Sequence, residues 1–399
     1  MTAPLTTTPL DEIDARIAKL QASLQEDGID GALILQNTDL FYFSGTIQQG
    51  HLYVPAQGRP LVMVRMNFER AREESPLPTV IPLKSPRQVP ERIRDNGLAP
   101  PAVLGMELDV LPANHYFTYR RLFDGSDIRD VSPSLRMIRS VKSDHELALI
   151  RQAAAYSDEI AALVPDLLQA GMTEIELAGK VEAQARRRGH QGTVRMRLWG
   201  AEMFYGHLMA GPSAAVPSFL ASPTGGASVS PAVAQGAGFR RIPRNEPILL
   251  DYVFAWQGYI SDHTRIFCIG RPPQFLVEAH AHMLDIQEQI KAMAKPGAVA
   301  GDLYAAAVKM AREKGCGDHF MGAGDDRVRF IGHGVGLELD EFPFLAKGQP
   351  TPLEENMVIA LEPKLIFPGK GVVGIENTHL VTADGLEQLT LAEQHIVSV

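Results

Sequence analysis

Four acidic residues in the C-terminal part of the chain lie in apolar segments, and they constrain the fold more than any other feature. They are Asp251 in PILLDYV, Asp262 in GYISDHTR, Glu362 in IALEP and Glu376 in GIENTHL. A charged group inside a protein needs a partner charge or a metal ion. Four carboxylates repel one another in one small site unless cations neutralise them. We therefore expect the chain to fold around cations.

The first two acids lie in a predicted β-hairpin. Asp251 and Asp262 are eleven positions apart, on two apolar segments that flank Trp256-Gln257-Gly258. Strands that fold back across a turn at this point bring the two carboxylates side by side. A solvated aspartate is the alternative, but LLDY places Asp251 directly after two leucines in a buried strand.

A histidine completes the candidate donor set. His333 lies in GHGVG, where the flanking glycines allow the backbone to approach the site closely. A lone histidine is more often a structural core residue than a ligand. Oxygen donors together with one imidazole suit Mn²⁺, Co²⁺, Fe²⁺ or Zn²⁺.

In their order and spacing, these motifs resemble the M24 "pita-bread" metallopeptidase family, in its Xaa-Pro aminopeptidase, prolidase and creatinase branch. The resemblance implies two divalent metal ions, with Asp251 on one metal and Asp262 and Glu376 bridging both. It implies that His333 is a ligand, and that Glu362 both binds a metal and serves as the general base or acid. It also implies a creatinase-like α/β N-terminal domain and an α+β catalytic domain built on a curved antiparallel sheet.

The same resemblance implies a hydrolase that removes the N-terminal residue from Xaa-Pro peptides by means of metal-activated water. A second hypothesis is a non-peptidase enzyme on this scaffold, either a small-amide hydrolase or a lyase acting on a small zwitterion. A third is a binding module that has lost catalysis, but relatives of that kind lose the ligands that this chain retains.

Three positions depart from the family pattern and bear on the substrate. Asp340, in ELDEFP, stands where Xaa-Pro peptidases carry a histidine, and Gly374 stands where they commonly carry an arginine. The segment before Asp251 also lacks the usual histidine, and His207 is a candidate to fill that space. Asp340 and His207 are therefore candidate catalytic residues. Asp340 is a candidate base, or a carboxylate that holds a histidine such as His207 or His379.

Periodicity and caps predict the domain organisation. We expect a disordered tail over 1–9, a creatinase-like N-terminal domain over 10–130, a linker over 131–143 and the catalytic domain over 144–399. Apolar spacing and punctuation by glycine and proline predict helices and strands. The helices are expected at 10–28, 144–169, 173–189, 273–295 and 301–315, and the N-terminal strands near 31–36, 51–56, 60–66 and 102–108.

The segment 206–239 is rich in glycine, alanine, serine and proline and contains no charged side chain. A flexible linker is one interpretation. We prefer a loop wrapped over the active site, because the segment directly precedes the first metal strand.

Composition limits the partners and the compartment. A net charge of −9 argues against nucleic acid as a main partner. No apolar run approaches the ~20 residues that span a bilayer. The N-terminus lacks the pattern of a secretory signal. The two cysteines, Cys268 and Cys316, cannot form a disulfide framework. We therefore expect a cytoplasmic enzyme that acts on peptides or small molecules, and the family resemblance implies a homodimer.

Overall fold

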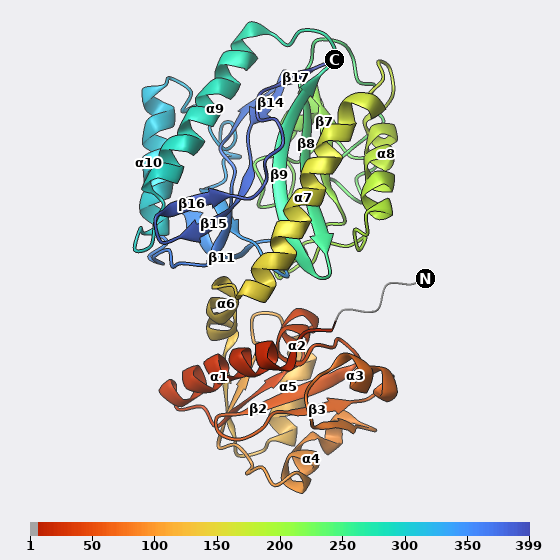
Figure 1. Cartoon of the computed structure of the whole chain (residues 1–399), viewed down its shortest axis with the longest axis vertical. Coiled ribbons are helices and arrows are strands. Elements are labelled where there is room, and N and C mark those ends of the chain that lie inside the picture. Colours follow the sequence, from red (N-terminus) through yellow and green to blue (C-terminus); the bar gives the residue numbers. More distant parts are fainter. Residues whose placement is uncertain (1–6) are drawn as a thin grey trace. The chain divides into compact units, whose positions relative to one another are not determined.

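A computed structural model describes residues 7–399, which form two compact units divided between Arg139 and Ser140 (Figure 1). Residues 1–6 of the predicted disordered tail lie outside the described residues. Residues 7–9 have no regular structure, and the first helix begins directly after them. The domain limits expected from the sequence stay a prediction.

The first unit is a mixed six-stranded sheet with helices around it. The strand order is β4-β3-β2-β1-β5-β6, with β1–β2 and β2–β3 antiparallel and the other pairs parallel. The elements are α1 (Leu10–Glu26), β1 (Gly31–Ile34), α2 (Asn37–Ser44), β2 (Gly50–Pro55), β3 (Leu61–Val64), α3 (Phe68–Glu74), β4 (Val80–Pro82), η1 (Pro86–Gln88), α4 (Val89–Asp95), β5 (Val103–Met106), α5 (Ala113–Leu122), β6 (Asp127–Asp130) and α6 (Ser132–Ser140).

The second unit contains two larger sheets and a two-stranded sheet. The strand orders of the three sheets are β17-β9-β8-β7, β11-β10-β12-β15-β16 and β13-β14. Neighbouring strands are antiparallel except for β17 and β9, which are parallel. The helices are α7 (Asp144–Leu167), α8 (Glu174–Arg187), η2 (Gly211–Ala215), α9 (Gln274–Met293) and α10 (Ala300–Glu313). The strands are β7 (Gly206–Ala210), β8 (Ile248–Trp256), β9 (Tyr259–Cys268), β10 (Phe330–Gly334), β11 (Glu341–Ala346), β12 (Val358–Leu361), β13 (Lys364–Phe367), β14 (Gly371–Gly374), β15 (Asn377–Thr382), β16 (Gly385–Gln388) and β17 (Val397–Ser398).

Helix α7 begins where the sequence predicts it, because Ser143 and Glu146 form a capping box that satisfies free backbone N–H groups. Helices α7 and α8 pack against the β7–β9 sheet, while α9 and α10 pack against strands of the other sheets (Figure 1). Buried apolar side chains from α7, α8 and β7–β9 form one continuous core. This core fixes the two strands that carry the first acidic pair.

The structure confirms the predicted fold class, an α/β N-terminal domain followed by an α+β catalytic domain with largely antiparallel sheets. The predicted helices and N-terminal strands are present, with ends that differ by a few residues. The prediction of a loop over 206–239 is wrong at its start, because 206–210 form strand β7 and pair with β8. Part of the remaining loop, Phe219 to Ser222, does line the pocket described below.

Candidate metal centre

The hairpin formed by β8 and β9 positions the two aspartates. In this hairpin Asp251 pairs with Thr264, and Asp262 pairs with Val253. Side chains alternate between the two faces of a strand, and directly paired residues share a face. Asp251 and Asp262 therefore project from the same face of the sheet. The hairpin predicted from the sequence, with its turn at Gln257-Gly258, is present.

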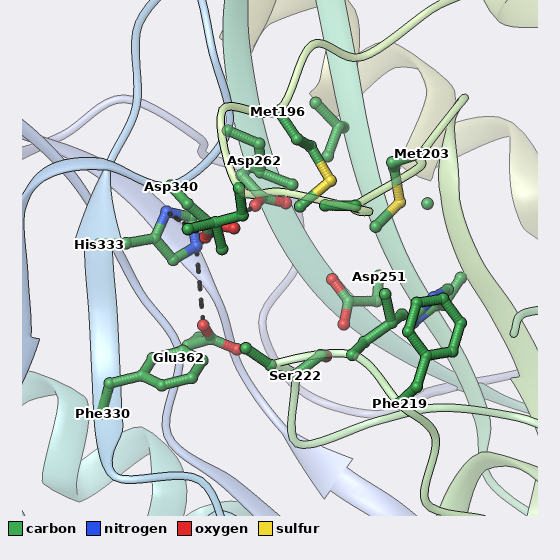
Figure 2. A pocket seen from close by; sticks show the side chains of 18 of the residues that line it. Met196, Met203, Phe219, Ser222, Asp251, Asp262, Phe330, His333, Asp340 and Glu362 are labelled. Atoms are coloured by element: carbon green, nitrogen blue, oxygen red, sulfur yellow. Dashed lines mark ion pairs between the residues drawn. The ribbon is translucent and has the colours of Figure 1, made fainter. Parts of the chain in front are cut away.

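The other three donors come from the neighbouring strands. His333 lies in β10, which pairs with β12, and Glu362 directly follows β12. Glu376 lies between β14 and β15 and forms a bridge to Thr264. All five donors line one pocket of about 220 Å³. Figure 2 shows His333, Asp262 and Glu362 pointing toward one another, with Asp251 entering the same space from the far side.

The imidazole of His333 faces three carboxylates at nearly equal distances. Its Nε2 lies 3.8 Å from Asp262, 3.7 Å from Glu362 and 3.9 Å from Glu376. These distances are too long for hydrogen bonds. They suit donor atoms that each lie about 2.0–2.2 Å from a common metal ion.

The second nitrogen of the ring fixes the tautomer. Nδ1 of His333 lies 3.1 Å from the Gly334 carbonyl oxygen, to which it donates. It also lies 3.7 Å from Asp340. When Nδ1 carries the proton, the lone pair of Nε2 is free for a metal.

A lysine lies on the other side of the glutamates. Lys364 Nζ is 2.7 Å from Glu362 Oε2, 2.8 Å from Glu376 Oε2 and 3.2 Å from Asp251 Oδ2. Its side chain is 1% exposed. Lys364 was not among the site residues expected from the sequence.

The pKa values of two acidic groups are raised, which indicates that positive charge is lacking around them. Burial, followed by the neighbouring carboxylates Glu376 and Asp251, raises the pKa of Asp262 well above its usual range. Burial raises the pKa of Glu376 to about 8, although Lys364 acts in the opposite direction. Burial lowers the pKa of His333, but nearby carboxylates, Asp340 first, outweigh it and raise that pKa overall.

Near Lys364, the positive charge of the ammonium outweighs the effect of burial on the pKa of the neighbouring carboxylate Asp251. Burial favours the neutral form of Asp251, but the Lys364 ammonium beside it holds its pKa below the ordinary value. Burial acts to lower the pKa of Lys364, yet the surrounding carboxylates raise it well above its usual range. The lysine is thus charged and neutralises part of the acidic cluster.

The donor set fits a divalent metal beside His333. Ligand atoms of Asp262, His333 and Glu376 all lie within 4.8 Å of one another. Asp262 Oδ1 is buried and has no hydrogen-bond partner within residues 7–399. A buried carboxylate oxygen without a partner is costly, and a metal ion would supply the missing contact.

The two candidate catalytic residues outside the donor set also line the pocket. His207 pairs with Asp251 across β7 and β8, and its ring nitrogens lie 3.2 Å from Thr224 and from Gln235. Burial lowers the pKa of His207, which favours its neutral form. The ring that Asp340 approaches is that of His333 rather than His207.

Sequence reasoning missed Lys364 and Thr224. Thr224 hydrogen-bonds Asp251 at 3.3 Å, and nothing in its serine- and proline-rich loop marks it. Lys364 did carry a signal, because it lies two positions after Glu362 at the start of the apolar strand KLIF. A lysine in a buried strand needs anionic partners, and the nearby glutamates supply them.

The fold and the donor set together define a metal-dependent enzyme with a separate α/β N-terminal domain. Family models identify it further: the model of metallopeptidase family M24 matches residues 148–383, and the creatinase/prolidase N-terminal domain matches residues 16–141. The chain belongs to metallopeptidase family M24, whose members use divalent metals.

Relatives of known name match nearly the whole chain. A Xaa-Pro dipeptidase of Pyrococcus furiosus is 28% identical over 96% of this chain and 99% of its own length. A Xaa-Pro dipeptidase of Lactobacillus delbrueckii subsp. lactis is 27% identical over 93% of this chain and 95% of its own.

Solved structures share the fold. A Xaa-Pro dipeptidase from Bacillus anthracis superposes with a TM-score of 0.82 at 23% identity, covering 97% of this chain and all of that one. A prolidase from Pyrococcus horikoshii OT3 gives 0.79 at 26% identity, covering 95% and 99%.

No helix within residues 7–399 combines the length and the apolar character needed to cross a bilayer.

Proposed function

We propose that this chain is a divalent-metal-dependent peptidase that hydrolyses the bond before proline and releases the N-terminal residue of Xaa-Pro peptides. The observation that carries the proposal is the position of His333 Nε2, 3.7–3.9 Å from three carboxylates of a pocket. Relatives named Xaa-Pro dipeptidase, aligned over nearly the whole chain, support the substrate class.

In this proposal Asp262, His333, Glu362 and Glu376 hold the metal. A bound divalent cation would polarise the substrate carbonyl and lower the pKa of a bound water. Glu362 borders the pocket beside His333, so its carboxylate is placed to take a proton from the attacking water and deliver it to the leaving nitrogen. Asp340 would hold the His333 ring in position, and His207 would meet the substrate as a neutral hydrogen-bonding group.

The apolar wall of the pocket suits a proline ring. Met196, Met203, Phe219 and Phe330 line the cavity around the acidic groups (Figure 2). Apolar and aromatic side chains with a few placed polar groups are typical of small-ligand sites. The metal itself is proposed to be Mn²⁺, Co²⁺, Zn²⁺ or Fe²⁺, since all four accept carboxylate and imidazole ligands.

The number of cations is part of the proposal. The family resemblance implies two, and the second would need the space bounded by Asp251, Asp262 and Glu376. The proposed reaction depends on the cation beside His333. A homodimer and a cytoplasmic location likewise stay predictions; light scattering of the purified protein tests the first.

A test compares wild type with His333→Ala, since the substitution removes the nitrogen ligand. We expect Mn²⁺-loaded wild type to cleave Xaa-Pro dipeptides or longer Xaa-Pro peptides, and chelator-treated wild type to be inactive. His333→Ala should bind metal at least about 100-fold more weakly and lose activity in proportion. His280→Gln is the matched control, because His280 is a buried histidine in α9 that does not line the pocket.

Equal cleavage with and without metal would refute the proposal. Tight metal binding without cleavage of any Xaa-Pro peptide would instead favour a small-amide hydrolase or lyase. Asp340 and Gly374, which depart from the peptidase pattern, are the specific reason to keep that second candidate. Small amides and zwitterions therefore belong in the same assay panel.

A further inference from the structure

We propose that the ammonium group of Lys364 takes the place of a second metal ion, so that this centre binds one divalent cation per chain. The inference rests on the proposed metal site beside His333 and goes beyond it, because it assigns the other half of the acidic cluster to a residue of the chain itself.

The contacts of Lys364 are those of a cation held by ligands. Its Nζ lies 2.7–3.2 Å from carboxylate oxygens of Asp251, Glu362 and Glu376. An ammonium group has three N–H donors and no acceptor. Three acceptors therefore use all three donors, and the side chain is fully buried with them.

Each of the two glutamates points one oxygen toward the proposed metal position beside His333 and the other toward Lys364. Glu362 directs Oε1 to within 3.7 Å of His333 Nε2 and places Oε2 2.7 Å from Lys364. Glu376 does the same, with Oε1 3.9 Å from His333 and Oε2 2.8 Å from Lys364. Each glutamate would thus bridge one metal ion and the ammonium group, instead of two metal ions.

The donor residues fall into one group around the proposed metal position and one residue, Asp251, on the Lys364 side. The ligand atoms of Asp262, His333 and Glu376 lie within 4.8 Å of one another. Asp251 is outside that group and receives Lys364 and the Thr224 hydroxyl instead. The aspartate expected to bind the other metal therefore already has a positive partner.

The Lys364 ammonium disfavours a second cation through its closeness rather than through net charge, since one divalent cation leaves a net charge of −1 and two leave +1. The four carboxylates carry four negative charges, and one divalent cation with one ammonium offsets three of them. Adding a second divalent cation would place it against the ammonium in a buried site. Like charges at such distances repel strongly where water is excluded.

A second observation comes from strand β14. Gly374 pairs directly with Lys364 across the β13–β14 ladder. A Cβ atom at position 374 would lie 2.7 Å from Lys364 Cα, 2.8 Å from its Cγ and 2.6 Å from the Pro363 oxygen. A side chain at 374 would therefore clash with the backbone at 363–364 and with the base of the Lys364 side chain, so the glycine leaves room for the observed position of the lysine.

The experiment counts bound metal rather than activity. Purified wild type, Lys364→Gly and Lys142→Met are stripped of metal, saturated with Mn²⁺, freed of excess and analysed for manganese per chain. Electron paramagnetic resonance of the same samples distinguishes an isolated Mn²⁺ from a spin-coupled pair. Lys142→Met is the matched control, because Lys142 is a buried lysine of the same unit that is bound by a different carboxylate, Glu341.

We expect one manganese per chain with an isolated-ion spectrum in wild type and in Lys142→Met. Lys364→Gly should rise to two per chain, with a coupled spectrum. Two manganese ions in wild type would overturn the inference and leave the proposed peptidase intact. A folded Lys364→Gly that stays at one would also overturn it.

No manganese in wild type at saturation, with Zn²⁺ and Co²⁺ equally absent, would overturn both the inference and the metal dependence of the proposed function. If Lys364→Gly does not fold, the wild-type count and spectrum decide by themselves.

Discussion

The two nitrogens of His333 have separate tasks. Nε2 faces the carboxylates that would share a metal, while Nδ1 donates to Gly334 and lies near Asp340. A carboxylate behind a metal-binding histidine fixes the ring and increases its strength as a ligand. In the proposed centre, the aspartate that departs from the peptidase pattern would therefore support the nitrogen ligand.

The substitution Asp340→Asn should weaken metal binding about 10-fold, because it removes the negative charge beside Nδ1 of His333. Isothermal titration with Mn²⁺ measures the change. Asp384→Asn, which alters an exposed acid in the turn between β15 and β16, is the control and should leave the affinity unchanged. Unchanged affinity in Asp340→Asn would assign Asp340 to the substrate alone.

Residue by residue, the sequence predicted which acidic residues share the pocket better than it predicted their surroundings. Asp251, Asp262 and Glu362 stand out because acids are rare in apolar strands. Lys364 could not be assigned in the same way, since a lysine at the start of a strand is usually at the surface. Its burial depends on the β13–β14 hairpin placing it against Asp251 of β8, a contact between distant parts of the chain that sequence periodicity does not encode.

Among the elements, the β8–β9 hairpin depends on a tight two-residue turn. Gln257 and Gly258 have φ angles of +48° and +94°. Two-residue turns with positive φ at both positions match the twist of the flanking strands and favour Asn-Gly. The turn therefore sets the register that brings Asp251 and Asp262 onto one face.

Substitutions in this turn should change stability in opposite directions. Gly258→Ala should lower the free energy of unfolding by about 1 kcal/mol, because a side chain is disfavoured at positive φ. Gln257→Asn should raise it by roughly 0.5 kcal/mol, because asparagine tolerates that conformation better. Urea denaturation measures both, and a shift of the same sign in the two variants would contradict this account.

Helices α7 and α8 were easier to predict than strand β7 for a physical reason. Caps such as Ser143 with Glu146, and apolar spacing within one turn, are local signals. Strand β7 lacks a local signal, because GHLMA begins a glycine- and serine-rich segment. It becomes a strand by pairing with β8, which lies far along the chain.

For the whole molecule, buried neutral histidines determine how stability responds to acid. Burial lowers the pKa of His51 and His190 to about 4, and that of His263 and His379 to about 3. Each is below the value of about 6.5 expected in the unfolded chain. Unfolding therefore takes up protons, and the stability that these groups contribute above pH 6.5 is lost as the pH falls toward 4.

His190 provides the test. Its Nδ1 accepts a hydrogen bond from the Gly192 N–H, and its Nε2 lies 3.1 Å from the Val253 oxygen, to which it donates. His190→Gln retains a donor and an acceptor but does not titrate. Between pH 7 and pH 4 the variant should lose on the order of 2 kcal/mol less stability than wild type. Urea denaturation across this range measures the slopes, and parallel curves would contradict the assignment.

Lys364 also affects what happens when metal is scarce. A positive charge carried by a side chain cannot be chelated or diluted, whereas a bound ion obeys mass action. When the metal leaves, Asp251, Glu362 and Glu376 still have the ammonium between them. These three carboxylates therefore keep a positive partner in the metal-free protein, and under the proposed single-metal arrangement one ion completes the centre.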